Sequence, residues 1–212
     1  MNYGVLSAGI LLFSFILVFA SYERKNISVK EISLMATLSG LAGVARVPFV
    51  ALPNVQPTTF LVMISGYVFG PGFGFMTGAF AALSSNFFLG QGPWTPWQML
   101  AWGLAGFSSG ILKKYVKNPS RLFFSIFAFV WGFLFGYIMN LWHWLFFVYP
   151  HTFKSLIITN MNGFYFDLMH GVGNFVFAYL FGKDFINILS RFKDRISYTE
   201  IPVKKIQQDN KY

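Results

Sequence analysis

The chain contains no cysteine among its 212 residues, which excludes disulfide bonds, thiolate metal ligands and cysteine nucleophiles. Charged residues are also scarce, at 11% of the chain against roughly 25% in an average soluble domain. Three histidines and one acidic residue in the apolar part of the chain, Asp167, are too few for a metal site of recognised spacing. We therefore predict no metal and no cofactor.

The chain also lacks the G-x-x-x-x-G-K-[ST] loop that binds the phosphates of ATP. A G-x-S-x-G match at residues 106–110 lies inside an apolar segment, whereas a nucleophile elbow requires a strand-to-helix turn. The sequence therefore predicts no enzyme activity of its own. Any step driven by ATP would need a partner that supplies the hydrolysis.

Apolar residues dominate instead: 55% of the chain is hydrophobic and 21% is aromatic. Seven apolar segments are predicted to be helices that cross the roughly 30 Å hydrocarbon layer, and the third is short for this role. They lie at residues 3–21, 32–52, 58–69, 73–88, 96–112, 122–148 and 163–182. The sequence thus predicts an all-α membrane protein.

Positive charge is distributed unevenly among the connections, although the net charge is +9. Fourteen of the sixteen Lys and Arg fall on one side of the predicted topology, and only Arg46 and Lys154 fall on the other. Because basic loops stay in the cytoplasm, we expect the N-terminus outside and the C-terminus inside. Charge beside apolar segments indicates membrane topology and contact with lipid rather than nucleic-acid binding.

Three parts follow from these patterns. Residues 1–28 are expected to form an N-terminal transmembrane anchor, because positive charges follow the first apolar segment, whereas a cleaved signal peptide carries them before it. Residues 29–182 are expected to form a six-helix substrate-binding membrane domain. Residues 183–212 are expected to form a basic cytosolic tail.

The three connections on the predicted outer side, 46–57, 89–97 and 149–162, are rich in proline, aromatic and polar residues. The stretch 86–100, NFFLGQGPWTPWQML, combines two tryptophans with amides and no charge. Tryptophan offers a flat apolar face and one hydrogen-bond donor, which suits an uncharged lid over a ring-containing solute, although an interfacial aromatic belt is an equal alternative. The candidate substrate-binding residues here are Arg46, Asn54, Gln56, Asn86, Gln91, Trp94 and Trp97.

Asp167 is expected about 8 Å below the outer end of its helix, with His170 and Asn174 on the same face. A charge at such depth usually has a partner or a role, and Arg46 is the nearest permanent cation. We predict that Arg46 and Asp167 form either an ion pair or two walls of one polar pocket. A pair that only sets helix registry is an equal alternative. A further alternative is an intramembrane enzyme that uses Asp167 and His170 as its acid and base.

Ala36 and Gly40 are separated by one helical turn, which allows another helix to approach closely. Packing within the same protein is the simpler reading. A purely structural membrane subunit that only assembles partners would also use such a face.

Three stretches carry a family resemblance: RVPFVALPNVQPTTF (46–60), GYVFGPGFGFMTGAFAALSSNFFLGQGPWTPWQMLAWGLAG (66–106) and FDLMHGVGNF (166–175). They resemble the substrate-binding S components of energy-coupling factor (ECF) transporters, over about residues 30–182. The resemblance implies a six-helix bundle in the bacterial plasma membrane that binds a vitamin outside. It also implies docking on a shared transmembrane T component with two cytosolic ATPases.

The resemblance further implies that the loops after the first, third and fifth bundle helices enclose the ligand. Ala36 and Gly40 would contact the T component. Residues 1–21 depart from the six-helix pattern as an extra helix. The similarity is closest to the cobalamin-type or uncharacterised vitamin S components, so cobalamin is the expected ligand, with another vitamin such as riboflavin, or a precursor, as the alternative.

Overall fold

The computed structural model describes residues 28–198 and, before them, only positions 5, 8–9, 12 and 15–16. The elements are α2 (Val29–Val44), the short 3-10 helix η1 (Val47–Phe49), α3 (Thr58–Phe69), α4 (Pro71–Leu89), α5 (Thr95–Tyr115), α6 (Arg121–Phe147) and α7 (Phe153–Tyr198). No strand occurs among these residues. The prediction of an all-α bundle of six helices is confirmed.

Several helix ends coincide with local signals in the sequence. The Ser28 hydroxyl accepts a hydrogen bond from the Glu31 amide at the start of α2, and Ser120 does the same for Phe123 at the start of α6. Gly70 separates α3 from α4 with a φ of 109°, a conformation that side chains disfavour. Pro71 is the first residue of α4, a position where the missing amide hydrogen of proline is not needed. The turn at Gly70 and Pro71 thus ends one helix and starts the next.

Two predicted helices have markedly different bounds in the structure, whereas the others differ by three residues or fewer at each end. The segment predicted at 32–52 ends its α-helix at Val44, because Pro48 has no amide hydrogen and interrupts the hydrogen-bond ladder. The segment predicted at 163–182 extends over Phe153–Tyr198. Its polar start is also helical, and there Thr159 and Asn160 satisfy their side-chain donors on carbonyl oxygens one turn earlier. The predicted boundary between bundle and tail at 182/183 is therefore not a helix end.

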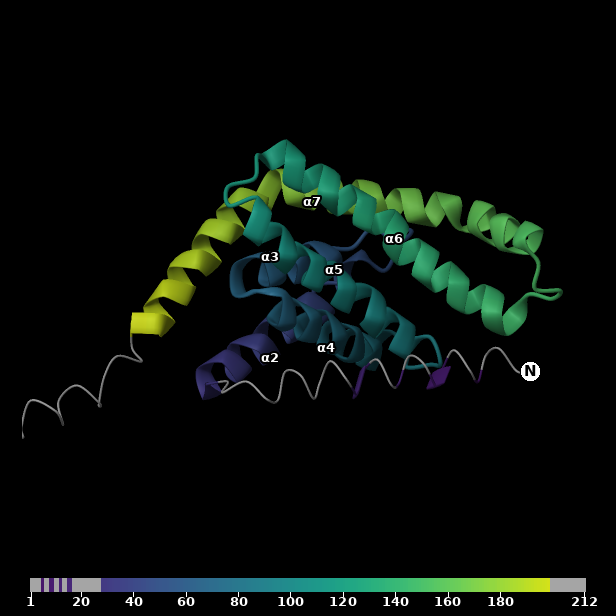
Figure 1. Ribbon diagram of the computed structural model, residues 1–212, viewed down its shortest axis with the longest axis horizontal. Coiled ribbons are helices and arrows are strands. Elements are labelled where there is room, and N and C mark those ends of the chain that lie inside the picture. The colour runs from purple at the N-terminus through teal and green to yellow at the C-terminus, as the bar shows by residue number, and fades with distance from the viewer. Residues whose placement is uncertain (1–4, 6–7, 10–11, 13–14, 17–27, 199–212) are drawn as a thin grey trace, which may run out of the picture.

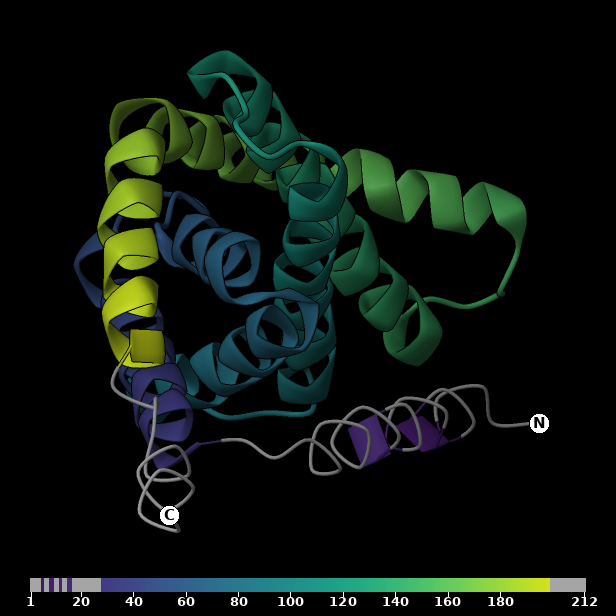
Figure 2. The same ribbon diagram turned by 60° about the vertical axis from the view of Figure 1, so that its left-hand side comes forward.

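The helices form a bundle with α3 at its centre, where ten of its twelve residues are buried. α6 and α7 lie side by side and antiparallel along one face, and α2, α4 and α5 cover the other side of α3 (Figure 1). α7 then bends, so that its last part runs in a new direction (Figure 2). The main core cluster joins Phe60, Met63 and Tyr67 of α3 to Phe124 and Trp131 of α6.

Glycine allows α3, α4 and α5 to approach closely. A Cβ atom on Gly66 or Gly74 would collide with the backbone of Gly106, and one on Gly106 would collide with Gly74. The three backbones are therefore in direct contact, which only glycine at these positions permits.

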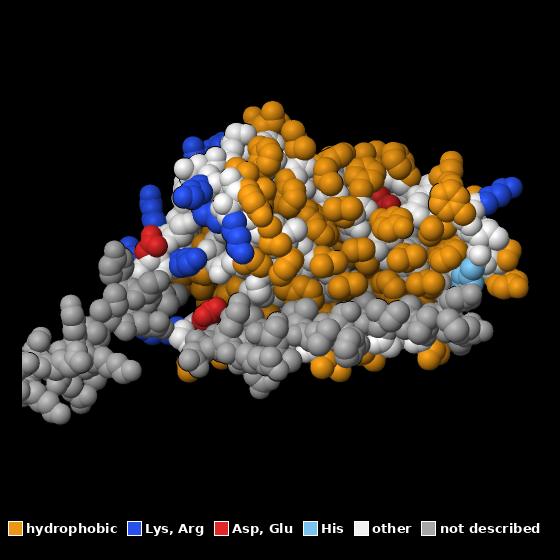
Figure 3. Space-filling model, viewed as in Figure 1, with side chains coloured by type: hydrophobic (Ala, Val, Ile, Leu, Met, Phe, Trp, Pro, Cys, Tyr) orange, Lys and Arg blue, Asp and Glu red, His pale blue; other side chains and the backbone are white. Residues whose placement is uncertain are grey.

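The outer surface is apolar over most of its area. α6 exposes an apolar residue every three or four positions, namely Phe123, Ile126, Val130, Leu134 and Tyr137. Figure 3 shows a broad apolar band, with Lys and Arg side chains gathered beyond one end of it. Among the described residues, three segments are long and apolar enough to cross a membrane: Val29–Phe49, Pro71–Leu89 and Arg121–Phe147. This surface suits a protein surrounded by lipid.

The predicted anchor at 3–21 lies almost entirely outside the described residues. Phe15, one of the few described positions there, is buried and packs against Phe75 of α4, with ring centroids 6.2 Å apart. That contact joins this part of the chain to the bundle.

Candidate ligand-binding site

The connection between α2 and α3 covers a cavity of about 330 Å³ at one end of the bundle. Arg46, Asn54 and Gln56 line it, and the rest of its wall is aliphatic or aromatic. Phe166 contributes from α7 and Leu89 from the end of α4. A mostly apolar cavity with a few polar groups that point into it is the usual form of a small-molecule site, and this one is at the small end of the common range.

The covering loop is tied to α7 by side-chain hydrogen bonds. Asn54 has a φ of 56°, which asparagine tolerates better than most residues. Its amide nitrogen donates to the Phe166 carbonyl oxygen at 3.0 Å, and the Gln56 amide nitrogen donates to Asn54 Oδ1 at 3.4 Å. The two predicted amides thus hold the loop in place as well as lining the cavity.

Arg46 connects the cavity to a polar network between α4 and α5. Its Nη1 atom donates to Ser85 Oγ and to Asn86 Oδ1, both at 3.4 Å. Asn86 is buried, and its Nδ2 atom donates to Thr95 Oγ1 at 2.9 Å and to Gln98 Oε1 at 2.7 Å. Asn86 therefore holds the Arg46 side chain in position through a hydrogen bond, but it does not line the cavity itself.

The remaining predicted residues of the α4–α5 connection make contacts within the protein. Gln91 donates to the Leu83 carbonyl oxygen and accepts a hydrogen bond from Thr95. Trp94 packs edge-on against Trp142 of α6, with ring centroids 6.2 Å apart. Trp97 is buried in an apolar cluster with Phe73 and Met76. None of Gln91, Trp94 and Trp97 lines the cavity beside Arg46.

A second polar chain runs beneath Arg46, whose guanidinium lies 5.4 Å from the centre of the Trp102 ring. Trp102 Nε1 donates to Thr59 Oγ1 at 2.9 Å, and that hydroxyl is 2.7 Å from His170 Nε2. His170 is fully buried, so it supports the floor of the site from within.

The predicted ion pair between Arg46 and Asp167 is wrong for the residues that the structure describes. Arg46 turns toward α4, whereas Asp167 faces α6 and accepts a hydrogen bond from Asn140 Nδ2 at 3.0 Å. Gly136 makes this possible, since a Cβ atom there would collide with the Asp167 carboxylate. Asp167 does not line the cavity either, so the two residues are not walls of this pocket.

His170 and Asn174 also bond elsewhere than to Asp167. Asn174 Nδ2 donates to the Ala128 carbonyl oxygen of α6 at 3.3 Å, and His170 bonds Thr59. No hydrogen bond joins Asp167 to His170 in the described part of the chain. Likewise, no group of three or more potential metal ligands occurs among the described residues.

The predicted docking face forms a separate groove of about 430 Å³ between α2 and α4. Ala36 and Gly40 line it together with Met35, Phe80 and Phe87. The close internal contact between these helices is made by Gly43, where a Cβ atom would collide with Ser84, while the space beside Gly40 is open. Packing between α2 and α4 therefore leaves the side of α2 that carries Ala36 and Gly40 accessible among the described residues.

A lipid-facing helical bundle with a small cavity under a proline-containing loop defines a membrane-embedded binding protein. The family model for the S component of ECF-type riboflavin transporters matches residues 26–191, which is most of the chain. The chain belongs to this family, a family of transporter components and not of enzymes.

Similar proteins include the UPF0397 protein of Aliivibrio fischeri (strain MJ11), which is 28% identical over 126 residues, or 53% of this chain and 68% of that protein. The UPF0397 protein of Streptococcus gordonii is 34% identical over 103 residues, or 45% of this chain and 53% of that protein. That of Vibrio atlanticus is 26% identical over 98 residues, or 44% and 53%. The matches thus span from about half to about two thirds of these relatives. No solved structure matches the chain.

Proposed function

We propose that this protein captures riboflavin, or a flavin precursor of similar size, in the cavity beneath the α2–α3 loop and presents it for import by an ECF module. The main observation in support is the size of the cavity, because a volume of about 330 Å³ suits a ligand of a few fused rings. Cobalamin, with its corrin macrocycle and nucleotide tail, needs much more space. The riboflavin description of the matching family supports the same choice.

The lining chemistry suits a planar ring with carbonyl groups. Phe49 and Phe166 offer apolar aromatic surface from two sides of the cavity. Arg46 provides N–H donors for ring carbonyls, because the hydrogen bonds found for it among the described residues use Nη1 alone. Asn54 and Gln56 add amide groups that both donate and accept.

Replacement of Arg46 by glutamine is expected to weaken riboflavin binding about 10- to 100-fold. A hydrogen bond from a charged donor contributes about 1.5–3 kcal/mol, and each 1.4 kcal/mol is tenfold in affinity. The measurement is quenching of flavin fluorescence by the purified protein, beside a panel of other ring-containing vitamins and cobalamin. The matched control is Lys154→Gln, which removes an exposed cation from the start of α7 and should leave the affinity unchanged.

Three results would count against this proposal. Failure of every flavin to bind the wild-type protein would show that the ligand is not a flavin. Tight binding of cobalamin would show that the protein takes the larger vitamin instead. Equal affinities of the Arg46 and Lys154 variants would place the ligand away from the α2–α3 loop.

We also propose that the α2–α4 groove receives the T component, and that two ATPases bound to it drive import. The open space beside Gly40 and the apolar lining of the groove support this assignment. The charge bias of the connections supports a plasma-membrane orientation with the ligand cavity outside and the C-terminus in the cytosol.

A further inference from the structure

The largest of the cavities described here, about 610 Å³, lies at the end of the bundle opposite the candidate ligand site. Four cations from four segments line it: Lys113 in α5, Lys117 in the α5–α6 connection, Arg121 at the start of α6 and Lys183 in α7. Among the residues that the structure describes, no carboxylate lines this cavity. The described acids on the same part of α7, Asp184 and Asp194, are outside its wall.

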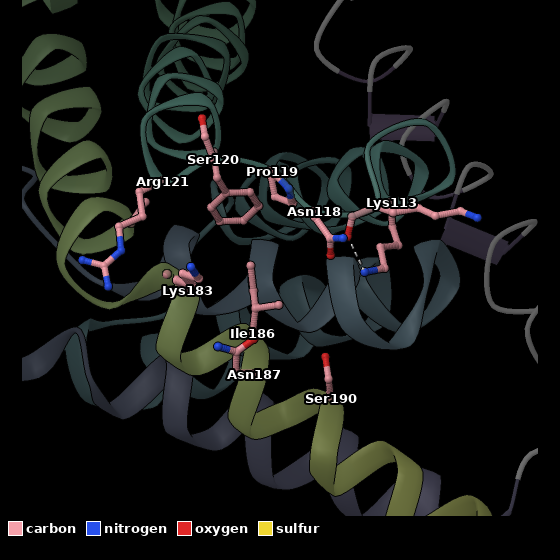
Figure 4. Close-up of a pocket in the computed structure, with 13 residues that line it drawn as sticks. Lys113, Asn118, Pro119, Ser120, Arg121, Lys183, Ile186, Asn187 and Ser190 are labelled. Carbon is pink, nitrogen blue, oxygen red and sulfur yellow. Dashed lines mark hydrogen bonds between the residues drawn. The ribbon is translucent and has the colours of Figure 1, made fainter.

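The bend in α7 builds this cavity. Figure 4 shows the helix turning at Lys183 and passing beneath the connection that carries Asn118, Pro119 and Ser120. Asn187 and Ser190 then line the cavity from the helix side, opposite Asn118. The polar wall thus offers amide and hydroxyl donors in addition to the four cations.

Like charges gathered in one place raise the electrostatic energy of the folded state unless an anion compensates them. Burial, followed by the charges of Lys193 and Lys117, lowers the pKa of Lys113. Lys113 donates to the Lys117 carbonyl oxygen at 2.9 Å, and Lys193 donates to the Val68 carbonyl oxygen at 2.8 Å. The contact of Lys113 is to a neutral carbonyl oxygen, so it does not neutralise the positive charge of that lysine.

The deeper wall of the cavity is apolar, formed by Phe124, Ala178 and Ile186. Exposed Leu122 and Phe123 follow Arg121 directly on α6. In Figure 3 the basic side chains border the apolar band, at the position expected for lipid headgroups. A cationic rim over an apolar floor matches a molecule with a phosphate at one end and a hydrocarbon chain at the other.

We propose that this cavity binds the phosphate headgroup of an anionic membrane lipid, with the lipid chain against Phe124 and Ile186. The cations converge from α5, the following connection, α6 and the bent part of α7. A bound headgroup would therefore join segments that are distant in sequence and hold the bend of α7 in place.

The test compares two double variants of the full-length protein. Lys117→Gln with Lys183→Gln removes two cavity cations, whereas Lys114→Gln with Arg191→Gln removes two exposed cations from the same helical regions outside the cavity. Each protein is delipidated and titrated with phosphatidylglycerol or phosphatidylcholine, and bound lipid is counted by native mass spectrometry. Inorganic phosphate and glycerol 3-phosphate form separate arms.

We expect the wild type and the control pair to retain phosphatidylglycerol in preference to phosphatidylcholine. The cavity pair should bind phosphatidylglycerol at least roughly tenfold more weakly, because each basic residue near a membrane surface adds measurably to anionic-lipid binding. Riboflavin binding in the same samples should stay unchanged, which separates this site from the outer cavity and verifies the fold.

Three results would overturn the proposal. Equal loss in both pairs would indicate diffuse attraction to the membrane. Absence of any preference for phosphatidylglycerol would exclude a headgroup site. Displacement of the lipid by inorganic phosphate at comparable concentration would assign the cavity to a soluble anion.

Discussion

Gly106→Ala is expected to destabilise the bundle by about 3 kcal/mol or more. Overpacking of a core typically costs about 1–3 kcal/mol, and here the added methyl group would meet the backbone of Gly74, which cannot move aside as a side chain would. Since α3, α4 and α5 all meet near Gly66, Gly74 and Gly106, the variant should disturb the packing of all three helices at once. Thermal unfolding in detergent, followed by size-exclusion chromatography, measures the loss.

Gly40→Ala is the matched control, because no atom of the described residues lies within 4 Å of the position of its Cβ atom. That variant should unfold at the same temperature or slightly higher, since alanine favours a helix over glycine by about 0.5–1 kcal/mol. Equal unfolding temperatures for the Gly106 and Gly40 variants would show that α5 does not contact α4 as closely as the structure has it.

Gly40→Leu or Ala36→Leu should prevent co-purification with the T component while leaving riboflavin affinity intact. Both side chains would fill the α2–α4 groove, and a helix that packs on small residues cannot approach over leucine. Thr37→Leu places the same side chain on an exposed position of α2 that does not line the groove, so this variant should still bind the partner. A pull-down with the T component and its ATPases compares the three.

A Gly40→Leu protein that assembles as well as wild type would place the interface on another face. If the Thr37 variant failed as completely as the groove variants, added bulk anywhere on α2 would explain the loss. Only selective failure of the groove variants supports docking at Ala36 and Gly40.

The helix bounds that the sequence predicts well are those with local signals. The third helix is found at 58–69 as predicted, and α6 begins within one residue of its predicted start because Ser120 caps it. α7 was predicted too short at both ends. Its early polar residues resemble a loop in composition, and the carbonyl oxygens that satisfy the side chains of Thr159 and Asn160 are in reach only once the helix has formed.

The site was less predictable because charge alone suggested the wrong partner for Arg46. Among the described residues Arg46 bonds uncharged Ser85 and Asn86, and Asp167 bonds Asn140. Each partner is on a different helix, and no spacing along the chain relates them. Gly136 and Asn140, one turn apart in an otherwise apolar segment, were the available signal for the true neighbour of Asp167.

Trp102, Thr59 and Phe166 were also missed as site residues, although each lies in one of the three stretches that carry the family resemblance. Their roles come from tertiary packing: Trp102 and Thr59 connect Arg46 to His170, and Phe166 closes the cavity from α7. By contrast, Arg46, Asn54 and Gln56 could be predicted because polar residues cluster there between prolines in an apolar chain.

Labelling of single cysteines in bacterial cells tests the central claim most directly, because the natural sequence contains none. Val50→Cys reports on the proposed outer cavity and Asn118→Cys on the opposite end of the bundle. We predict that a membrane-impermeant maleimide labels Val50→Cys in intact cells, that riboflavin protects it, and that Asn118→Cys reacts only after permeabilisation. Labelling of Asn118→Cys in intact cells, with Val50→Cys reactive only after permeabilisation, would contradict capture of the ligand from outside.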